Sequence, residues 1–300
     1  SKSGGKGSLQ KIPNKSMITK ILDGKALSLK VANELSEKVS EYKKNGLRPK
    51  LATVLVGDDP ASRVYVNLKK KDSEKIGIDY EEFYYHNISE EDLLSLIDKL
   101  NKRTDIHGIL AQLPLPKHID SNKVLERIDP IKDVDGFTPI NVGRILLNIS
   151  DIFPCTPKGV VKILDEYNIP IEGADITIIN RSNIIGKPLA AMMINRGGTV
   201  TVVHSKTKDL KEKTKHADII VVGVGKTDFL TADMVKEGAV VVDVGITRDV
   251  DGIKGDVKYD EVSKKTSYIT PVPGGVGPMT RAMLLENLII CFIKQNDCAR

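Results

Sequence analysis

Tryptophan is absent from this 300-residue chain, and aromatic residues make up only 4% of it. Cysteine is also scarce: Cys155, Cys291 and Cys298 are odd in number, and no two of them form a C-x-x-C pair. This usage argues against a disulfide-stabilised extracellular domain and predicts reduced thiols in an intracellular protein. The five histidines are scattered, with no pair four residues apart, so no metal site is expected.

A dense cluster of basic residues is missing as well. Four of the net +5 charges come from residues 1–16, which contain no acidic residue, so the remainder carries only 5 − 4 = +1. That balance argues against a nucleic-acid partner. The longest apolar run, at 283–293, is interrupted by polar residues such as Glu286 and Asn287. No membrane-spanning segment is therefore expected.

The opening segment, residues 1–16, is rich in serine, glycine and lysine and lacks the apolar stretch of a secretory signal. We interpret it as a disordered tag or a leader remnant, with Met17 as the natural start. The expected location is cytoplasmic, or organellar if residues 1–16 remain from a leader.

What the chain has instead is an alternation of strand and helix patterns from residue 22 onward. This order is typical of α/β proteins whose parallel sheets are covered by helices. We expect two three-layer α/β domains, 17–139 and 140–278, with an amphipathic helix at 279–296 returning to the first. Expected strands are 51–56, 80–85, 108–113, 175–180, 199–204, 218–224, 239–244 and 267–270. Expected helices include 25–44, 60–76, 89–102 and 279–295.

The stretch "TIINRSNIIGKP" (177–188) has the pattern of a strand, a turn and a helix. Dinucleotide-binding folds place Gly-x-Gly-x-x-Gly there, because glycines let the backbone approach the pyrophosphate. Here only Gly186 remains, and Asn180 holds the first glycine position. Asparagine tolerates left-handed backbone angles, so this change does not by itself break the turn.

The next predicted strand ends in a "HSKT" segment that contains no acidic residue. Enzymes that use NAD place a carboxylate near this point to hold the ribose. The cationic and hydroxyl side chains here favour the 2′-phosphate of NADP instead. A strand–helix corner with solvated loop residues is the alternative. The residues concerned are Arg181, Ser182, Ser205 and Lys206.

The first unit contains three separate polar features. Tyr65 and Lys69 are four residues apart and share a helix face, although a solvated lysine run is the simpler reading. Gln112 ends an apolar strand, at the edge where open α/β sheets bind ligands. Asp133 and Asp135 lie in "KDVDGF", where a carboxylate can accept paired hydrogen bonds from a heterocycle or can simply form an Asx turn.

Taken together, these segments resemble one family, the bifunctional methylenetetrahydrofolate dehydrogenase/methenyltetrahydrofolate cyclohydrolases, known as FolD in bacteria. The resemblance covers nearly all of 17–296. It rests on "VGDDPASRVYVNLKKK", "GILAQLPLP", "KDVDGF", "PCTPKG", "RSNIIGKP", "HSKT", "GDV" and "ITPVPGGVGPMT", in that order. It implies a folate domain and an NADP-binding Rossmann domain on either side of a cleft, usually in a homodimer.

The resemblance also implies an activity. Such enzymes oxidise 5,10-methylenetetrahydrofolate to the methenyl form with NADP and hydrolyse that form to 10-formyltetrahydrofolate, which feeds purine synthesis. Tyr65 is then expected to stack on the folate, Lys69 and Gln112 to be catalytic, and Asp135 to contact the pterin with Asp133 as its turn partner. The other implied substrate-binding residues are Pro271, Gly274 and Gly275. The implied cofactor-binding residues are Asn180, Arg181, Ser182, Gly186, His204, Ser205, Lys206, Val224, Gly225 and Ile246.

One departure from the family concerns the cofactor. The family commonly has Gly-Arg-Ser where this chain has Asn180-Arg181-Ser182, so weakened NADP binding is expected, and Asn180→Gly is expected to lower the Michaelis constant. Two other functions remain open at this point. One is a dehydrogenase without cyclohydrolase activity, or another two-domain NADP oxidoreductase of the shikimate dehydrogenase type. The other is a catalytically silent binding protein.

Overall fold

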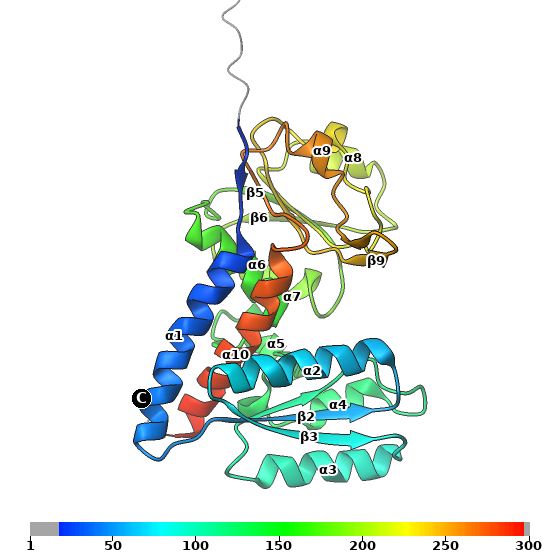
Figure 1. Ribbon diagram of the computed structural model, residues 1–300. Helices are drawn as coiled ribbons and strands as arrows, with labels where there is room; N and C mark the ends of the chain where they lie inside the picture. Colours follow the sequence, from blue (N-terminus) through cyan, green and yellow to red (C-terminus); the bar gives the residue numbers. More distant parts are fainter. Residues whose placement is uncertain (1–17, 297–300) are drawn as a thin grey trace, which may run out of the picture.

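The computed structural model describes residues 18–296, and Figure 1 shows two α/β units joined by long helices. The expected tag or leader at 1–16, the start at Met17 and Cys298 lie outside the described residues. Helix α1 (Gly24–Lys44) and helix α10 (Val276–Gln295) run side by side between the two units. The predicted fold class, two three-layer α/β units, is confirmed.

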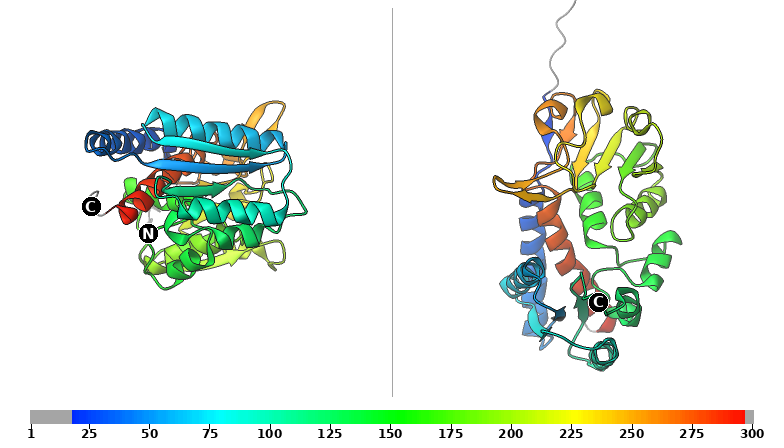
Figure 2. Two further views of the ribbon diagram at one scale, coloured as in Figure 1. Left: turned by 90° about the horizontal axis from the view of Figure 1, so that it is seen from below. Right: turned by 90° about the vertical axis from the view of Figure 1, so that its right-hand side faces the viewer.

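The first unit is built on a short parallel sheet. Strand β2 (Lys50–Val56) lies at its centre, between β3 (Asp79–Tyr85) and β4 (Gly108–Ala111). Nearly every residue of β2 is buried, as expected for a central strand that is covered on both faces. Figure 2 shows the sheet between two helical layers. These layers contain α2 (Pro60–Lys75) on one side, and α3 (Glu90–Lys102) and α4 (Ser121–Arg127) on the other.

The second unit contains a six-stranded parallel sheet in the order β1-β11-β8-β7-β5-β6. Chain order reverses direction beside β5, because the chain passes first to β6 on one side and then to β7 on the other. The strands are β1 (Lys20–Ile21), β5 (Asp175–Ile179), β6 (Thr199–Val203), β7 (Ile219–Val222), β8 (Val240–Asp243) and β11 (Tyr268–Ile269). The helices of this part of the chain are α5 (Pro139–Leu146), α6 (Cys155–Glu166), α7 (Gly186–Asn195), α8 (Leu210–Thr214) and α9 (Tyr259–Val262).

Two details differ from the sequence prediction. The two-residue strand β1 pairs with β11 of the second sheet, although residues 17–139 were assigned to the first unit. A strand this short has no readable side-chain alternation, so its partner depends on the tertiary fold. The hairpin of β9 (Thr247–Asp249) and β10 (Gly252–Lys254) was also missed.

Helix α10 is long and apolar enough to cross a membrane by length and composition, which the sequence analysis did not expect of this segment. It is the one helix of this kind among residues 18–296. Most of its apolar window is buried, and it packs between α1 and α6. The helix is therefore part of the hydrophobic core that joins the two units.

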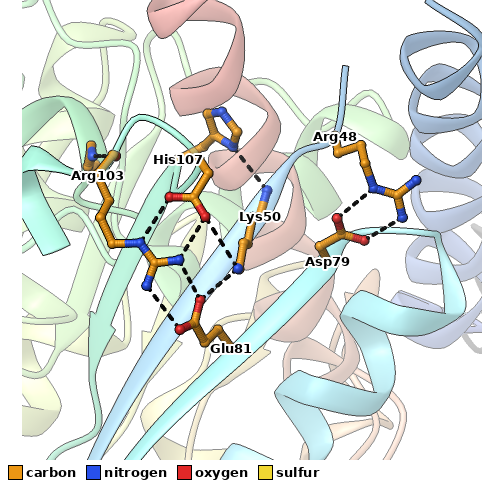
Figure 3. A network of polar contacts seen from close by, with 8 residues as sticks. Arg48, Lys50, Asp79, Glu81, Arg103 and His107 are labelled. Carbon is orange, nitrogen blue, oxygen red and sulfur yellow. Dashed lines mark hydrogen bonds and ion pairs between the residues drawn. The ribbon is translucent and has the colours of Figure 1, made fainter. Parts of the chain in front are cut away.

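A network of charged side chains lies at the amino ends of the strands in the first unit (Figure 3). Arg103 forms paired hydrogen bonds with Glu81, at 3.0 and 2.9 Å, and with Asp105, at 2.9 and 2.7 Å. Lys50 adds a 2.6 Å ion pair to Glu81. These contacts tie the starts of β2 and β3 to the segment before β4, at the edge opposite Gln112.

We expect Arg103→Met to lower the free energy of unfolding by about 1 kcal/mol, and Arg103→Lys, which keeps the charge but not the paired geometry, to lower it by less. The hydrogen bonds from Arg103 hold the pKa values of Glu81 and Asp105 below their usual range. The stabilisation should therefore be complete above the ordinary carboxyl pKa of about 4 and decline as the pH falls further. Urea unfolding at pH 7 and pH 3 measures this, and an equal loss at both values would contradict it.

Candidate functional site

Lys69 and Gln112 are brought together from different elements of the first unit. Lys69 lies on α2, and its Nζ donates to Oε1 of Gln112 at 2.7 Å. Nε2 of Gln112 donates to the carbonyl of Leu113 at 2.9 Å, which fixes the orientation of the amide. Tyr65 lies one helical turn before Lys69 and is 42% exposed, so its ring is available to a ligand. The face predicted from the four-residue spacing therefore meets the carboxyl end of β4.

The "KDVDGF" turn divides its two carboxylates between different environments. Asp133 is buried, and its oxygens accept from the amides of Gly136, Phe137 and Thr138 and from Nδ2 of Asn141, at 2.9 to 3.3 Å. Its hydrogen-bonding capacity is thus taken up by the turn itself. Asp135 is only partly buried and is the carboxylate that this turn presents.

Asp135 also has an unusual acidity. Burial raises the pKa of its carboxyl to about 6, the nearby Lys69 ammonium opposes that rise, and the negative charge of Asp133 adds to it. Lys69 on α2 is thus hydrogen-bonded to Gln112 at the end of β4 and lies within electrostatic range of Asp135 in the "KDVDGF" turn.

A buried amide from α10 holds the segment next to Asp135, a role that the sequence did not predict. Nδ2 of Asn287 donates to the carbonyls of Val134 and Phe153, at 2.9 and 2.8 Å, while its Oδ1 accepts from Nζ of Lys158 at 2.9 Å. Asn287 is fully buried. The only sequence signal was that Asn287, like Glu286, interrupts the apolar run at 283–293.

The glycine-rich loop before α10 lies against the first turn of α1. The carbonyl of Gly274 accepts from the amide of Lys25 at 3.0 Å. A Cβ on Gly24 would lie 1.8 Å from the carbonyl oxygen of Gly275, so only glycine fits at that position. Pro271, at the start of the loop, lines a cavity of about 500 Å³ together with Asp243 and Thr270. The structure thus places Gly274 and Gly275 against the first turn of α1, and Pro271 at the cavity beside the end of β8.

The residues predicted to bind the cofactor gather at one edge of the second sheet. Asn180 to Ser182 follow β5, His204 to Lys206 follow β6, Val224 and Gly225 come after β7, and Ile246 comes after β8. Because these strands are parallel neighbours, their carboxyl ends meet at the same edge. The edge includes the point between β5 and β7 where chain order reverses, which is where open α/β sheets bind ligands.

Asn180 organises the turn after β5. Its Oδ1 accepts from the Ser182 amide and hydroxyl, both at 2.8 Å, and from the Gly186 amide at 2.9 Å. Its Nδ2 donates to the carbonyl of Gly223, after β7, at 2.8 Å. The side chain therefore links the ends of β5 and β7 and the start of α7.

The loop after β7 depends on Asp256, which the sequence analysis had included only as part of the "GDV" motif. The Asp256 carboxylate accepts from the amides of Val224, Gly225 and Lys226, at 2.6, 3.1 and 3.0 Å. Asp256 is fully buried, and a Cβ on Gly245 would lie 2.1 Å from its carboxylate carbon. The sequence does not show that the segment containing Asp256 packs against the loop after β7, so this contact could not be predicted from it.

The side chains at this edge fit a phosphorylated dinucleotide. Arg181, Ser205 and Lys206 are exposed donors that suit a phosphate. Gly186 closes the turn where a Cβ would lie 1.9 Å from the Asn180 carbonyl oxygen. Gly225 has φ of 70° and open space where a Cβ would be. His204 accepts from the Lys206 amide at 3.2 Å and so helps to shape the loop after β6.

Comparison with known proteins agrees with this arrangement. The catalytic domain of tetrahydrofolate dehydrogenase/cyclohydrolase matches residues 22–135, and its NAD(P)-binding domain matches residues 154–296. The bifunctional protein FolD of Ligilactobacillus salivarius is 52% identical over 275 residues, which cover 91% of this chain and 96% of the relative.

Two solved structures are also similar. The bifunctional FolD methylenetetrahydrofolate dehydrogenase/cyclohydrolase of Campylobacter jejuni has a TM-score of 0.91 and 52% identity, covering 93% of this chain and 100% of that chain. The Trypanosoma brucei enzyme, N5,N10-methylenetetrahydrofolate dehydrogenase-cyclohydrolase in complex with NADP cofactor and inhibitor, has a TM-score of 0.87 and 36% identity, covering 92% and 98%. The resemblance stated from the motifs is thereby confirmed, and the chain belongs to the tetrahydrofolate dehydrogenase/cyclohydrolase family.

Proposed function

We propose that this chain oxidises 5,10-methylenetetrahydrofolate with NADP and hydrolyses the resulting methenyl compound to 10-formyltetrahydrofolate. One observation supports the assignment of both activities to a single site: Lys69 Nζ lies 2.7 Å from Gln112 Oε1, in the electrostatic neighbourhood of Asp135. These three residues come from separate segments, and the family suggests them as the catalytic group. The domains implied by the resemblance, 17–139 with helix 279–296 and 140–278, remain our proposed division.

In the oxidation step, the main task of the protein is orientation. The exposed ring of Tyr65 offers a surface on which the folate can stack. The Asp135 carboxylate accepts hydrogen bonds from the ring N–H and amino groups of the pterin. NADP supplies the acceptor for the hydride that leaves the bridging carbon. Arg181, Ser205 and Lys206 are the residues that would hold its 2′-phosphate, and Pro271 to Gly275 would border the reacting rings.

In the hydrolysis step, a water oxygen bonds to the cationic methenyl carbon, and the bond from that carbon to N5 breaks. The water gives up both of its protons as its oxygen becomes the formyl oxygen: one ends on N5 and the other is released to solvent, so a group must carry protons between these positions. Lys69 Nζ is the candidate, because Gln112 holds it at the end of β4, within electrostatic range of Asp135. The Gln112 amide is held in turn by the Leu113 carbonyl, which keeps its oxygen directed at Lys69.

Replacement of Lys69 tests this assignment. We expect Lys69→Met to reduce cyclohydrolase turnover by at least about 100-fold, the usual scale of general acid–base catalysis, while a reduced folate still binds. Lys70→Met, an exposed lysine on the same helix, is the matched control and should leave turnover unchanged. Hydrolysis is followed through the absorbance of methenyltetrahydrofolate. A Lys69→Met enzyme that hydrolyses at the wild-type rate would mean that another group carries the proton.

The acidity of Asp135 predicts a pH dependence for folate binding. With a pKa of about 6 in the free protein, Asp135 is ionised above that pH and becomes protonated as the pH falls below it. We expect the dissociation constant of a non-reactive reduced folate to rise by up to about tenfold per pH unit below 6. Asp135→Asn should bind weakly and lack this dependence. Calorimetric titration between pH 5 and pH 8 measures both, and an unchanged pH profile in the variant would contradict the role.

We further propose that a second copy of the chain covers an apolar surface formed by α5, α7 and β6. Strand β6 is an edge strand, and edge strands offer unpaired backbone groups to a partner. Helix α5 packs on α7, and Nδ2 of Asn195 donates to the Ile145 carbonyl at 2.7 Å. The exposed apolar residues of this surface are Ile140, Leu146, Leu147, Ile149, Ile194 and Val202. A surface of this kind is typical of a subunit interface.

If this surface forms the homodimer, Leu146→Glu combined with Leu147→Glu should convert the dimer to a monomer at micromolar concentration. Burying two carboxylates in an apolar interface is unfavourable, which is the reason for the expected dissociation. Leu29→Glu, at an exposed leucine on α1, is the matched control. Sedimentation velocity reports the mass, and a double variant that remains dimeric would place the interface elsewhere.

For location we propose the cytoplasm, or an organelle if residues 1–16 remain from a leader. Cys155 and Cys291 are free and buried, which is compatible with a reducing compartment. The partners that we propose are tetrahydrofolate one-carbon derivatives and a second copy of the chain, without nucleic acid or membrane.

A further inference from the structure

The turn after β5 differs from a glycine-rich phosphate cradle in where its donors point. In such a cradle the helix N-terminal amides face the ligand. Here the Gly186 amide, at the start of α7, is already bonded to Asn180 Oδ1. The Ser182 amide and hydroxyl hydrogen are also directed to that oxygen, and the Ser182 oxygen accepts from the Ile185 amide at 3.1 Å. The Asn180 oxygen thus engages three donors that would otherwise be free to bind an anion.

Among residues 180–182, this arrangement leaves the Arg181 side chain as the main hydrogen-bond donor for a cofactor. Arg181 is exposed and lies between Asn180 and Ser182, the two residues that the network immobilises. The exposed residues Ser205 and Lys206 follow β6, which is paired with β5 along its whole length. The turn therefore supports a cation beside the loop where a ribose 2′-phosphate is recognised.

The amide nitrogen of Asn180 links the turn after β5 to the end of the neighbouring strand β7. Nδ2 donates to the Gly223 carbonyl, so the ends of β5 and β7 cannot separate without breaking the bond. These strands border the point where chain order reverses. Glycine at residue 180 would lack all four side-chain hydrogen bonds and would add backbone freedom.

We propose that in this chain Asn180, in place of the glycine that the family commonly has, is the positioning residue for recognition of the 2′-phosphate of NADP, and that it acts through Arg181. The inference rests on the proposed use of NADP, and it goes further by assigning the discrimination against NAD to a residue that need not touch the cofactor. This proposal is the opposite of the expectation from the sequence, which was that glycine at this position would tighten NADP binding.

The test compares the binding of NADP, NAD and 2′,5′-ADP by calorimetry in the wild type, Asn180→Ala and Asn180→Gly. We expect both variants to bind NADP and 2′,5′-ADP roughly tenfold more weakly, because the lost hydrogen bonds no longer hold Arg181 in place. NAD binding should change by less than about twofold, since NAD has no 2′-phosphate for Arg181 to contact. The glycine variant keeps the test usable if the alanine variant does not fold, because the family commonly has glycine there.

Two controls separate positioning from general stability. Asn183→Ala removes an exposed amide of the same turn, whose Oδ1 accepts only from Lys187 Nζ among the described contacts, and it should leave NADP binding unchanged. The Asn180 variants lose four hydrogen bonds and should unfold at a lower temperature, so NAD binding, measured well below that temperature, reports whether the cofactor site is intact. A damaged site would weaken NADP and NAD equally.

A double-variant cycle tests whether Asn180 acts through Arg181. In an Arg181→Ala background, Asn180→Ala should weaken NADP binding little further, because coupled residues are not additive. Fully additive losses, equal weakening of NADP and NAD, or unchanged or tighter NADP binding in the Asn180 variants would each overturn the inference. Failure of the wild type to bind NADP would instead overturn the proposed function.

Discussion

The burial of α10 is the constraint on which the relative placement of the two units depends. This apolar helix begins at the glycine-rich loop beside the second sheet, packs between α1 and α6, and reaches the first unit. Its apolar surface is removed from water only when both units contribute to its cover. Asn287 is its one buried polar side chain, and it donates to the carbonyl of Val134, next to Asp135. The helix that forms the core between the units therefore also holds the segment that contains Asp135.

The two ends of each parallel sheet carry different kinds of polar residue. At the amino ends of the strands in the first sheet, Arg103 forms ion pairs with Glu81 and Asp105 that stabilise the fold (Figure 3). At the carboxyl ends, polar side chains face other elements or solvent, as Gln112 does toward Lys69 and as Arg181 does after β5. Because all strands of a parallel sheet end on one side, residues far apart in sequence become neighbours there.

Much of this could be predicted from sequence where the signal is local. The four-residue spacing of Tyr65 and Lys69 and the position of Gln112 at a strand end both depend on short-range periodicity. Asp256 and Asn287 could not be assigned in this way, because their partners lie about thirty to one hundred and fifty residues away. Asn180 was noticed but read as a lost glycine, since a backbone pattern does not reveal what a side chain will bind. The strand β1 was too short to show any pattern.

The pairing of β1 with β11 also bears on how the chain is made. These two strands are neighbours at one edge of the six-stranded sheet, yet one is near the start of the described chain and the other comes just before α10. A nascent chain on the ribosome therefore cannot complete this edge, or cover α1, until β11 and α10 have emerged. The close contact of Gly24 with Gly275 can form only after that point. A chain truncated before α10 would leave α1 uncovered and exposed to chaperones and proteases.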